Sequence, residues 1–269
     1  MASSTALLEA MIRRDRLVLV AAMLVVSALA WVWLILGAGM DMSAIEMTRM
    51  AGMDGWMMQP AVWTPAYALL MVSMWWVMMV AMMLPSAAPT LLLFARVNRK
   101  EKAAGSPLMP TGAFATGYLI AWGGFSVVAT GLQWALETAR LMSPMLLLET
   151  ANVWIGVAIL VGAGLWQLTP LKTMCLHHCR SPLGFLIGNW RAGRLGALRM
   201  GFEHGAYCLG CCWFLMALLF FGGVMNLYWI VGLAAFVLLE KTVPLGHWLG
   251  RVAGIALLGW GGVLATRAL

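Results

Sequence analysis

Five cysteines are the residues of this 269-residue chain whose types and spacing could do chemistry. Thiolates are soft ligands that bind Cu(I) and also Zn²⁺, and two close thiols can exchange electrons as a disulfide. The first two cysteines are spaced i, i+4, and about 30 residues later come a C-x-x-C motif and an adjacent cysteine, which together predict a thiolate metal site. The five are Cys175, Cys179, Cys208, Cys211 and Cys212.

A histidine adds to the metal-site prediction. His204 precedes Cys208 and Cys211 at i, i+4 and i+7, which places the three side chains on one face of a helix. We therefore include His204 among the candidate ligands. Cys212 follows Cys211 directly and so points about 100° away from it, which leaves a packing role open for this cysteine. The spacing of the first cysteine pair is not that of a standard zinc finger, so zinc is the less favoured metal.

Methionine is the second unusual residue type, with 13 of the 23 methionines between residues 40 and 83. Seven lie in or beside a loop predicted over 39–61. On the next apolar segment four share one helical face and form a methionine stripe: Met71, Met74, Met78 and Met82. A thioether is an uncharged soft ligand that suits Cu(I), although methionine also simply packs in cores. We predict that the loop collects Cu(I) and that the stripe, through Met78 and Met82, carries it toward the cysteines.

The elements that must position these ligands are membrane-spanning helices. The chain is 63% hydrophobic and 10% charged, with a mean hydropathy of +0.89, whereas a soluble domain is nearer half apolar and a quarter charged. We predict one all-α integral membrane domain over residues 1–269, a polytopic bundle of about seven spans. The helix of the second span is expected to kink or end near Pro85. The predicted spans are 17–38, 62–94, 112–136, 151–169, 202–222, 224–240 and 248–266.

The basic residues predict the orientation of the bundle. With a cytoplasmic N-terminus, 14 of the 17 lysines and arginines fall on the cytoplasmic face, which predicts a multi-pass protein of the bacterial inner (cytoplasmic) membrane. The first span resembles a signal peptide, but its apolar run of 22 residues predicts a retained helix. Membrane lipid accounts for the net charge of +7, so we expect no nucleic-acid partner. Glu240 and Lys241, which close the sixth span, are expected to compensate each other as neighbours.

Copper handling is the function that these patterns favour. The protein would be a Cu(I) permease or a metal-delivery and assembly factor, with a membrane subunit or a copper chaperone as its partner. Two alternatives stay open: a membrane thiol or copper redox enzyme that uses Cys208 and Cys211, and a structural subunit of a larger membrane complex. The sequence does not establish an enzyme, since it contains no phosphate loop, nucleophile elbow or paired-carboxylate site.

Three sequence blocks add a resemblance to a known family. They are WWVMMVAMMLPSAAP over residues 75–89, WQLTPLKTMCLHHCRSP over 166–182 and YCLGCCWFLMALLFFGGVMNLYW over 207–229. Together they resemble a bacterial family of uncharacterised integral membrane proteins that are described as predicted metal-binding membrane proteins. The resemblance covers most of residues 66–241 and implies a metal site at the five cysteines. It implies no particular metal, substrate or reaction, and it includes neither the N-terminal 60 residues nor the last helix.

Overall fold

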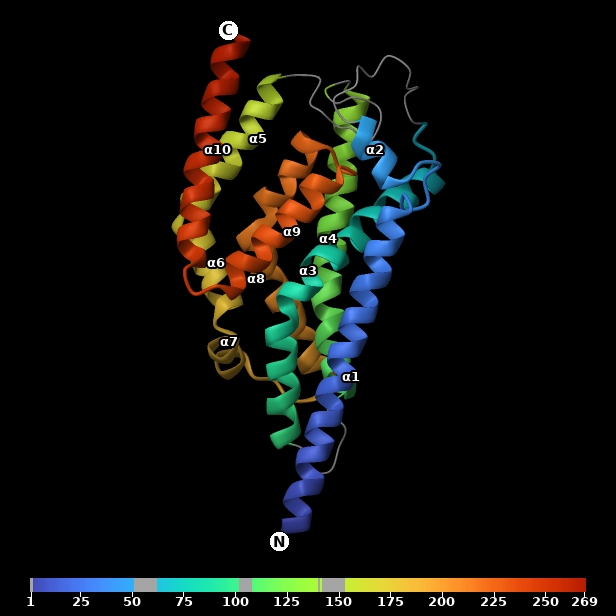
Figure 1. The fold of residues 1–269 in the computed structure, drawn as a ribbon, viewed down its shortest axis with the longest axis vertical. Coiled ribbons are helices and arrows are strands. Elements are labelled where there is room, and N and C mark those ends of the chain that lie inside the picture. Colours follow the sequence, from blue (N-terminus) through green and yellow to red (C-terminus); the bar gives the residue numbers. More distant parts are fainter. Residues whose placement is uncertain (1, 51–61, 102–107, 140, 142–152) are drawn as a thin grey trace.

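The computed structural model describes residues 2–50, 62–101, 108–139, 141 and 153–269, and these residues form ten helices and no strand. The longer helices lie side by side in a bundle, and the two chain termini lie at opposite ends of the molecule (Figure 1). The predicted all-α class is therefore confirmed for this part of the chain. The helices are α1 (Ala2–Ile35), α2 (Ala44–Met50), α3 (Pro65–Glu101), α4 (Leu108–Thr138), α5 (Val153–Leu168), α6 (Pro170–Arg180), α7 (Pro182–Asn189), α8 (Gly193–Gly222), α9 (Leu227–Thr242) and α10 (Gly246–Ala268).

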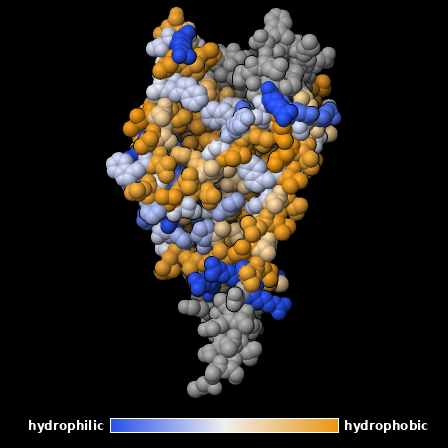
Figure 2. Space-filling view, viewed as in Figure 1, coloured by the Kyte–Doolittle hydropathy of each residue, from blue (hydrophilic) through white to orange (hydrophobic). Residues whose placement is uncertain are grey.

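Five of these helices are long and apolar enough to cross a membrane, namely α1, α3, α4, α8 and α10. A sixth span results if α5 and α6, which meet at a bend of 64°, count as one broken span. The remaining candidate, α9, has 16 residues, which is short for the roughly 20 that a span needs. The predicted count of seven is thus not confirmed. Apolar side chains cover much of the visible face between the two ends, as Figure 2 shows, which is compatible with a membrane protein.

The stretch between the fourth and fifth predicted spans is more helical than the sequence suggests. A new helix begins after Thr169, whose side chain accepts a hydrogen bond from the Lys172 amide (3.2 Å) while Pro170 occupies the first helical position. Ser181 separates this helix from α7, and α8 begins at Gly193 rather than near residue 202. α6 is polar, and α7 is apolar but only eight residues long, which is why hydropathy alone predicts a span at neither.

The second predicted span is one continuous helix. α3 continues through Pro85 and Pro89 to Glu101, so the helix does not end at the first proline, although it changes direction along its length (Figure 1). Its buried face is made largely of sulfur-containing and aromatic side chains. α3 packs mainly against α4, α1 and α9, and its Trp75 ring meets Phe220 of α8 in the buried core.

Helices α4 and α8 form the tightest contact in the fold. A side chain at Gly201 of α8 would overlap the carbonyl oxygen of Phe114, and one at Gly117 of α4 would overlap the carbonyl oxygen of Leu198. The two backbones therefore touch, as is typical of membrane helices that meet through small residues. This contact positions α8, which carries His204 and three cysteines, against the face of α4 that contains Phe114, Tyr118 and Ala121.

Candidate metal centre

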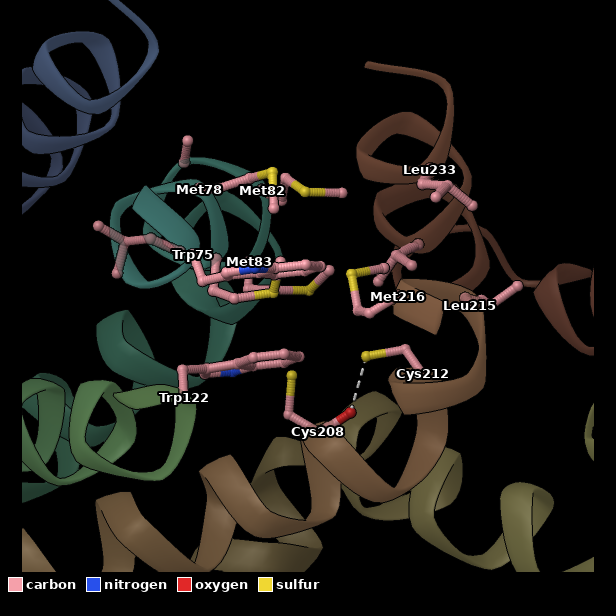
Figure 3. Packing of buried hydrophobic residues seen from close by; sticks show 14 of the residues in the cluster. Trp75, Met78, Met82, Met83, Trp122, Cys208, Cys212, Leu215, Met216 and Leu233 are labelled. Carbon is pink, nitrogen blue, oxygen red and sulfur yellow. Dashed lines mark hydrogen bonds between the residues drawn. The ribbon is translucent and has the colours of Figure 1, made fainter. Parts of the chain in front are cut away.

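Cys208 lies at the centre of the cysteine group. It is buried on α8, and the thiols of Cys179, Cys211 and Cys212 lie near its own thiol. The thiols of Cys211 and Cys212 also donate to the Cys208 carbonyl oxygen, at 3.0 and 2.9 Å, and Figure 3 shows the second of these contacts. All five cysteines are free thiols. We call Cys179, Cys208, Cys211 and Cys212 the thiol cluster.

Two polar side chains from other helices contact the Cys208 sulfur, and a third hydrogen bonds to one of them. The ammonium group of Lys241 on α9 donates to it at 2.8 Å and also to the hydroxyl of Ser86 on α3 at 3.2 Å. The hydroxyl of Tyr118 on α4 lies 3.1 Å from the same sulfur. A thiolate is the form of cysteine that binds metal, and a cationic neighbour provides the charge that balances it. Sequence reasoning missed these residues because no local spacing connects them with the cysteines.

The expected pairing of Glu240 with Lys241 is wrong. Adjacent residues on a helix do not face each other, so the two side chains point to different neighbours. Lys241 contacts the thiol cluster, whereas the Glu240 carboxylate forms a buried ion pair with Lys172 of α6. Lys172 also donates to the side-chain oxygen of Gln167 at the end of α5.

The first cysteine pair divides between the centre and the edge of the site. Cys175 and Cys179 both lie on α6, which supplies the helix that their i, i+4 spacing requires. Both side chains are half-buried: Cys179 lies near the thiols of Cys208 and Cys211, whereas the Cys175 sulfur faces α8, where a Cβ atom on Gly210 would lie 2.7 Å from it. The structure therefore brings four of the five predicted cysteines together and leaves Cys175 beside them.

His204 is buried one turn before Cys208 on α8. Its ring packs against Tyr118, Phe114 and Phe185, with the centroids 5.2 to 6.0 Å apart. The Nδ1 atom is buried and has no hydrogen-bond partner, which leaves a ring nitrogen available as a ligand. His204 thus lies next to the thiol cluster without hydrogen bonding to it.

The methionine stripe is buried inside the bundle. Met71, Met74, Met78 and Met82 each expose 1% or less of their surface. In Figure 3, Met216 of α8 lies between the thioethers of Met78 and Met82 and the thiol of Cys212, and all of these residues belong to one buried cluster. Sequence reasoning missed Met216, although its position one turn after Cys212 was a signal that could have identified it.

The donor set suits a soft monovalent ion better than zinc. In the described part of the chain, no three histidine, cysteine, aspartate or glutamate side chains are arranged so that they could hold a metal ion as they stand. A structural Zn²⁺ site needs four such ligands in a tetrahedron, whereas Cu(I) is satisfied by fewer thiolate or thioether ligands. Buried thiol and thioether sulfur atoms are of the ligand type that Cu(I) prefers.

These features define a helical protein with long apolar helices and a buried, sulfur-lined core. Residues 72–264 match a family that is described as a copper chaperone, PpoB2. Because the match spans well over half of the chain, the protein belongs to this PpoB2 copper chaperone family. The match includes all five cysteines and extends into α10, which the sequence resemblance does not reach. No curated protein and no solved structure matches the chain significantly.

Proposed function

We propose that the protein receives Cu(I) at its outer face, passes it inward along the methionine stripe and holds it at the thiol cluster for delivery to an acceptor protein. The observation that carries this proposal is the continuous series of buried sulfur atoms through the bundle. It begins with thioethers on α3, continues through Met216 and ends at the thiols around Cys208. Neutral thioethers bind Cu(I) weakly and so permit exchange, whereas thiolates bind it tightly because they are charged and soft.

Delivery is the form of copper handling that the comparisons favour over permeation. The family is described as a copper chaperone. The thiol cluster lies at the end of the proposed copper path, and the ammonium group of Lys241 provides a counter-charge there. The distribution of basic residues supports a position of this cluster near the cytoplasmic face of the bacterial inner membrane, with the N-terminus cytoplasmic. In this proposal the acceptor is a copper protein or a second copper chaperone on that side.

The tight site is tested by titrating Cu(I) against a competing chelator, with the protein in nanodiscs and free of other metals. Cys208→Ser and Cys179→Ser should each weaken Cu(I) binding by about a hundredfold or more, since a charged soft ligand is replaced by a neutral hard one. Cys175→Ser is the matched control, because Cys175 lies on the same helix as Cys179 but at the edge of the site. Unchanged affinity in both test variants would remove the thiol cluster from the function.

The methionine stripe is tested by the rate of loading. The double variant Met78→Leu, Met82→Leu conserves side-chain volume and should leave the affinity of the thiol cluster intact, while it slows Cu(I) arrival from the outer face of oriented vesicles. Met200→Leu, at an equally buried position on α8, is the control for packing. Normal loading in the double variant would show that the stripe only packs.

A further inference from the structure

A carboxylate lies at the end of the bundle where the methionine stripe begins. Glu137 is half-buried in the last turn of α4 and accepts hydrogen bonds from the indole of Trp63 at 2.8 Å and from the amide of Gln133 at 2.9 Å. Apart from Glu101, it is the only acidic residue in the sequences of α3 and α4. The copper path proposed above does not include Glu137.

One amide group connects this carboxylate to the stripe. Gln133 is fully buried, and its side-chain nitrogen lies 2.9 Å from the Glu137 carboxylate and 3.7 Å from the sulfur of Met71. Its side-chain oxygen accepts a hydrogen bond from the indole of Trp75 at 2.9 Å, which fixes the orientation of the amide. The carboxylate and the first thioether of the stripe are therefore held on either side of the same NH₂ group.

We propose that Glu137 and Met71 form a capture site for a soft monovalent cation, Cu(I), at the outer end of the methionine stripe. This inference rests on the proposed copper path and adds its first binding site. A path built only of thioethers has no charge to offset that of the ion, so each ion entering it would lose its hydration without electrostatic compensation. Glu137 provides one negative charge where the ion leaves water, and Met71 provides the soft ligand that distinguishes Cu(I) from harder cations.

The geometry also explains how the ion would pass inward. The contact between Gln133 and the Met71 sulfur is long and weak, so a metal ion can replace it at small cost. The shorter bond from Gln133 to Glu137 and the bond from Trp75 to Gln133 hold the carboxylate and the amide in position during this exchange. Met74, one turn further along α3, is then the next thioether of the stripe.

The test uses the full chain in nanodiscs, labelled at the methionine methyl groups and followed by NMR. Ag⁺ serves as the soft monovalent probe. The background replaces Cys175 and all four residues of the thiol cluster by serine, so that no thiol competes for the probe. We expect the Met71 signal to shift on addition of Ag⁺, and Glu137→Gln to weaken this binding by about tenfold or more, because a unit charge close to the ion is lost. Glu46→Gln removes an exposed carboxylate on α2 and is the matched control.

Two further measurements keep the inference falsifiable. If Glu137→Gln does not fold, Met71→Leu, which conserves the packing volume, should weaken Ag⁺ binding to a similar extent with Glu137 intact, as followed by the signal of the neighbouring Met74. Zn²⁺ should not shift the Met71 signal. An unshifted Met71 signal, equal Ag⁺ binding in the Glu137 and Glu46 variants, or an equal response to Zn²⁺ would each overturn the capture site. Loading of the thiol cluster in the chain with native cysteines is a separate measurement, so failure there would refute the proposed function and leave the capture site standing.

Discussion

The ion pair between Lys172 and Glu240 provides the sharpest test of how the site is held together. The two side chains expose 3% and 0% of their surface, and they connect α6, which carries Cys179, to α9, which carries Lys241. Glu240 also faces Gly250 of α10 so closely that a Cβ atom there would overlap its carboxylate. The pair therefore holds together two of the helices that bring side chains to Cys208 and its neighbours.

The cost of breaking the pair follows from its burial. Glu240→Met leaves the Lys172 ammonium buried without its counter-charge, which should lower the free energy of unfolding by about 3–5 kcal/mol. The double variant Lys172→Met, Glu240→Met removes both charges and roughly conserves volume, so it should be destabilised much less than the single variant, by about 1 kcal/mol for the hydrogen bond that Gln167 loses. Arg180 does not replace Lys172, because its guanidinium donates to the Val243 and Pro244 carbonyl oxygens.

Reversible unfolding in mixed micelles, followed by circular dichroism, measures these differences. Glu203→Met is the control, because Glu203 pairs with Arg191 and Arg199 at a position where all three side chains are partly exposed, and its loss should cost about 0–1 kcal/mol. The reasoning is refuted if Glu240→Met costs no more than Glu203→Met, or if the double variant is as unstable as the sum of its single changes. A second readout, faster modification of Cys179 by a thiol reagent in Glu240→Met, reports whether α6 moves away from α8.

Three further outcomes are expected. Gly201→Ala should destabilise the fold by about 1–3 kcal/mol in the same unfolding assay, because its methyl group collides with the backbone of α4 and the helices cannot part freely; a neutral effect would contradict the close α4–α8 contact. Gly210→Ala should alter the reactivity of Cys175 toward thiol reagents without loss of fold, since the new methyl group meets only that flexible side chain. Unchanged reactivity would mean that Cys175 does not contact Gly210. Cu(I) affinity at the thiol cluster should fall as the pH is lowered, because protons compete with the metal for thiolates, and a pH-independent affinity would point to the thioethers as the tight ligands.

Much of the architecture follows from the amino-acid sequence alone. The apolar composition predicts helices of membrane-spanning length, since a chain with so few polar residues cannot cover a water-exposed globule. Helical periodicity also predicts which side chains share a face, and it correctly groups the buried stripe from Met71 to Met82 and aligns His204 with Cys208 and Cys211. These features are local, because they depend only on positions within a few turns of one helix.

The partners of those faces were decided by the tertiary structure. Lys241 and Tyr118 reach the Cys208 sulfur from helices that are distant in the chain, and Glu240 pairs with Lys172 rather than with its neighbour in sequence. Periodicity specifies the direction of a side chain on its own helix, but the contact that it makes depends on how closely other helices approach. In this protein that approach is set by glycine contacts such as Gly201 against α4 and by the break between α5 and α6, which turns the first cysteine pair toward the second.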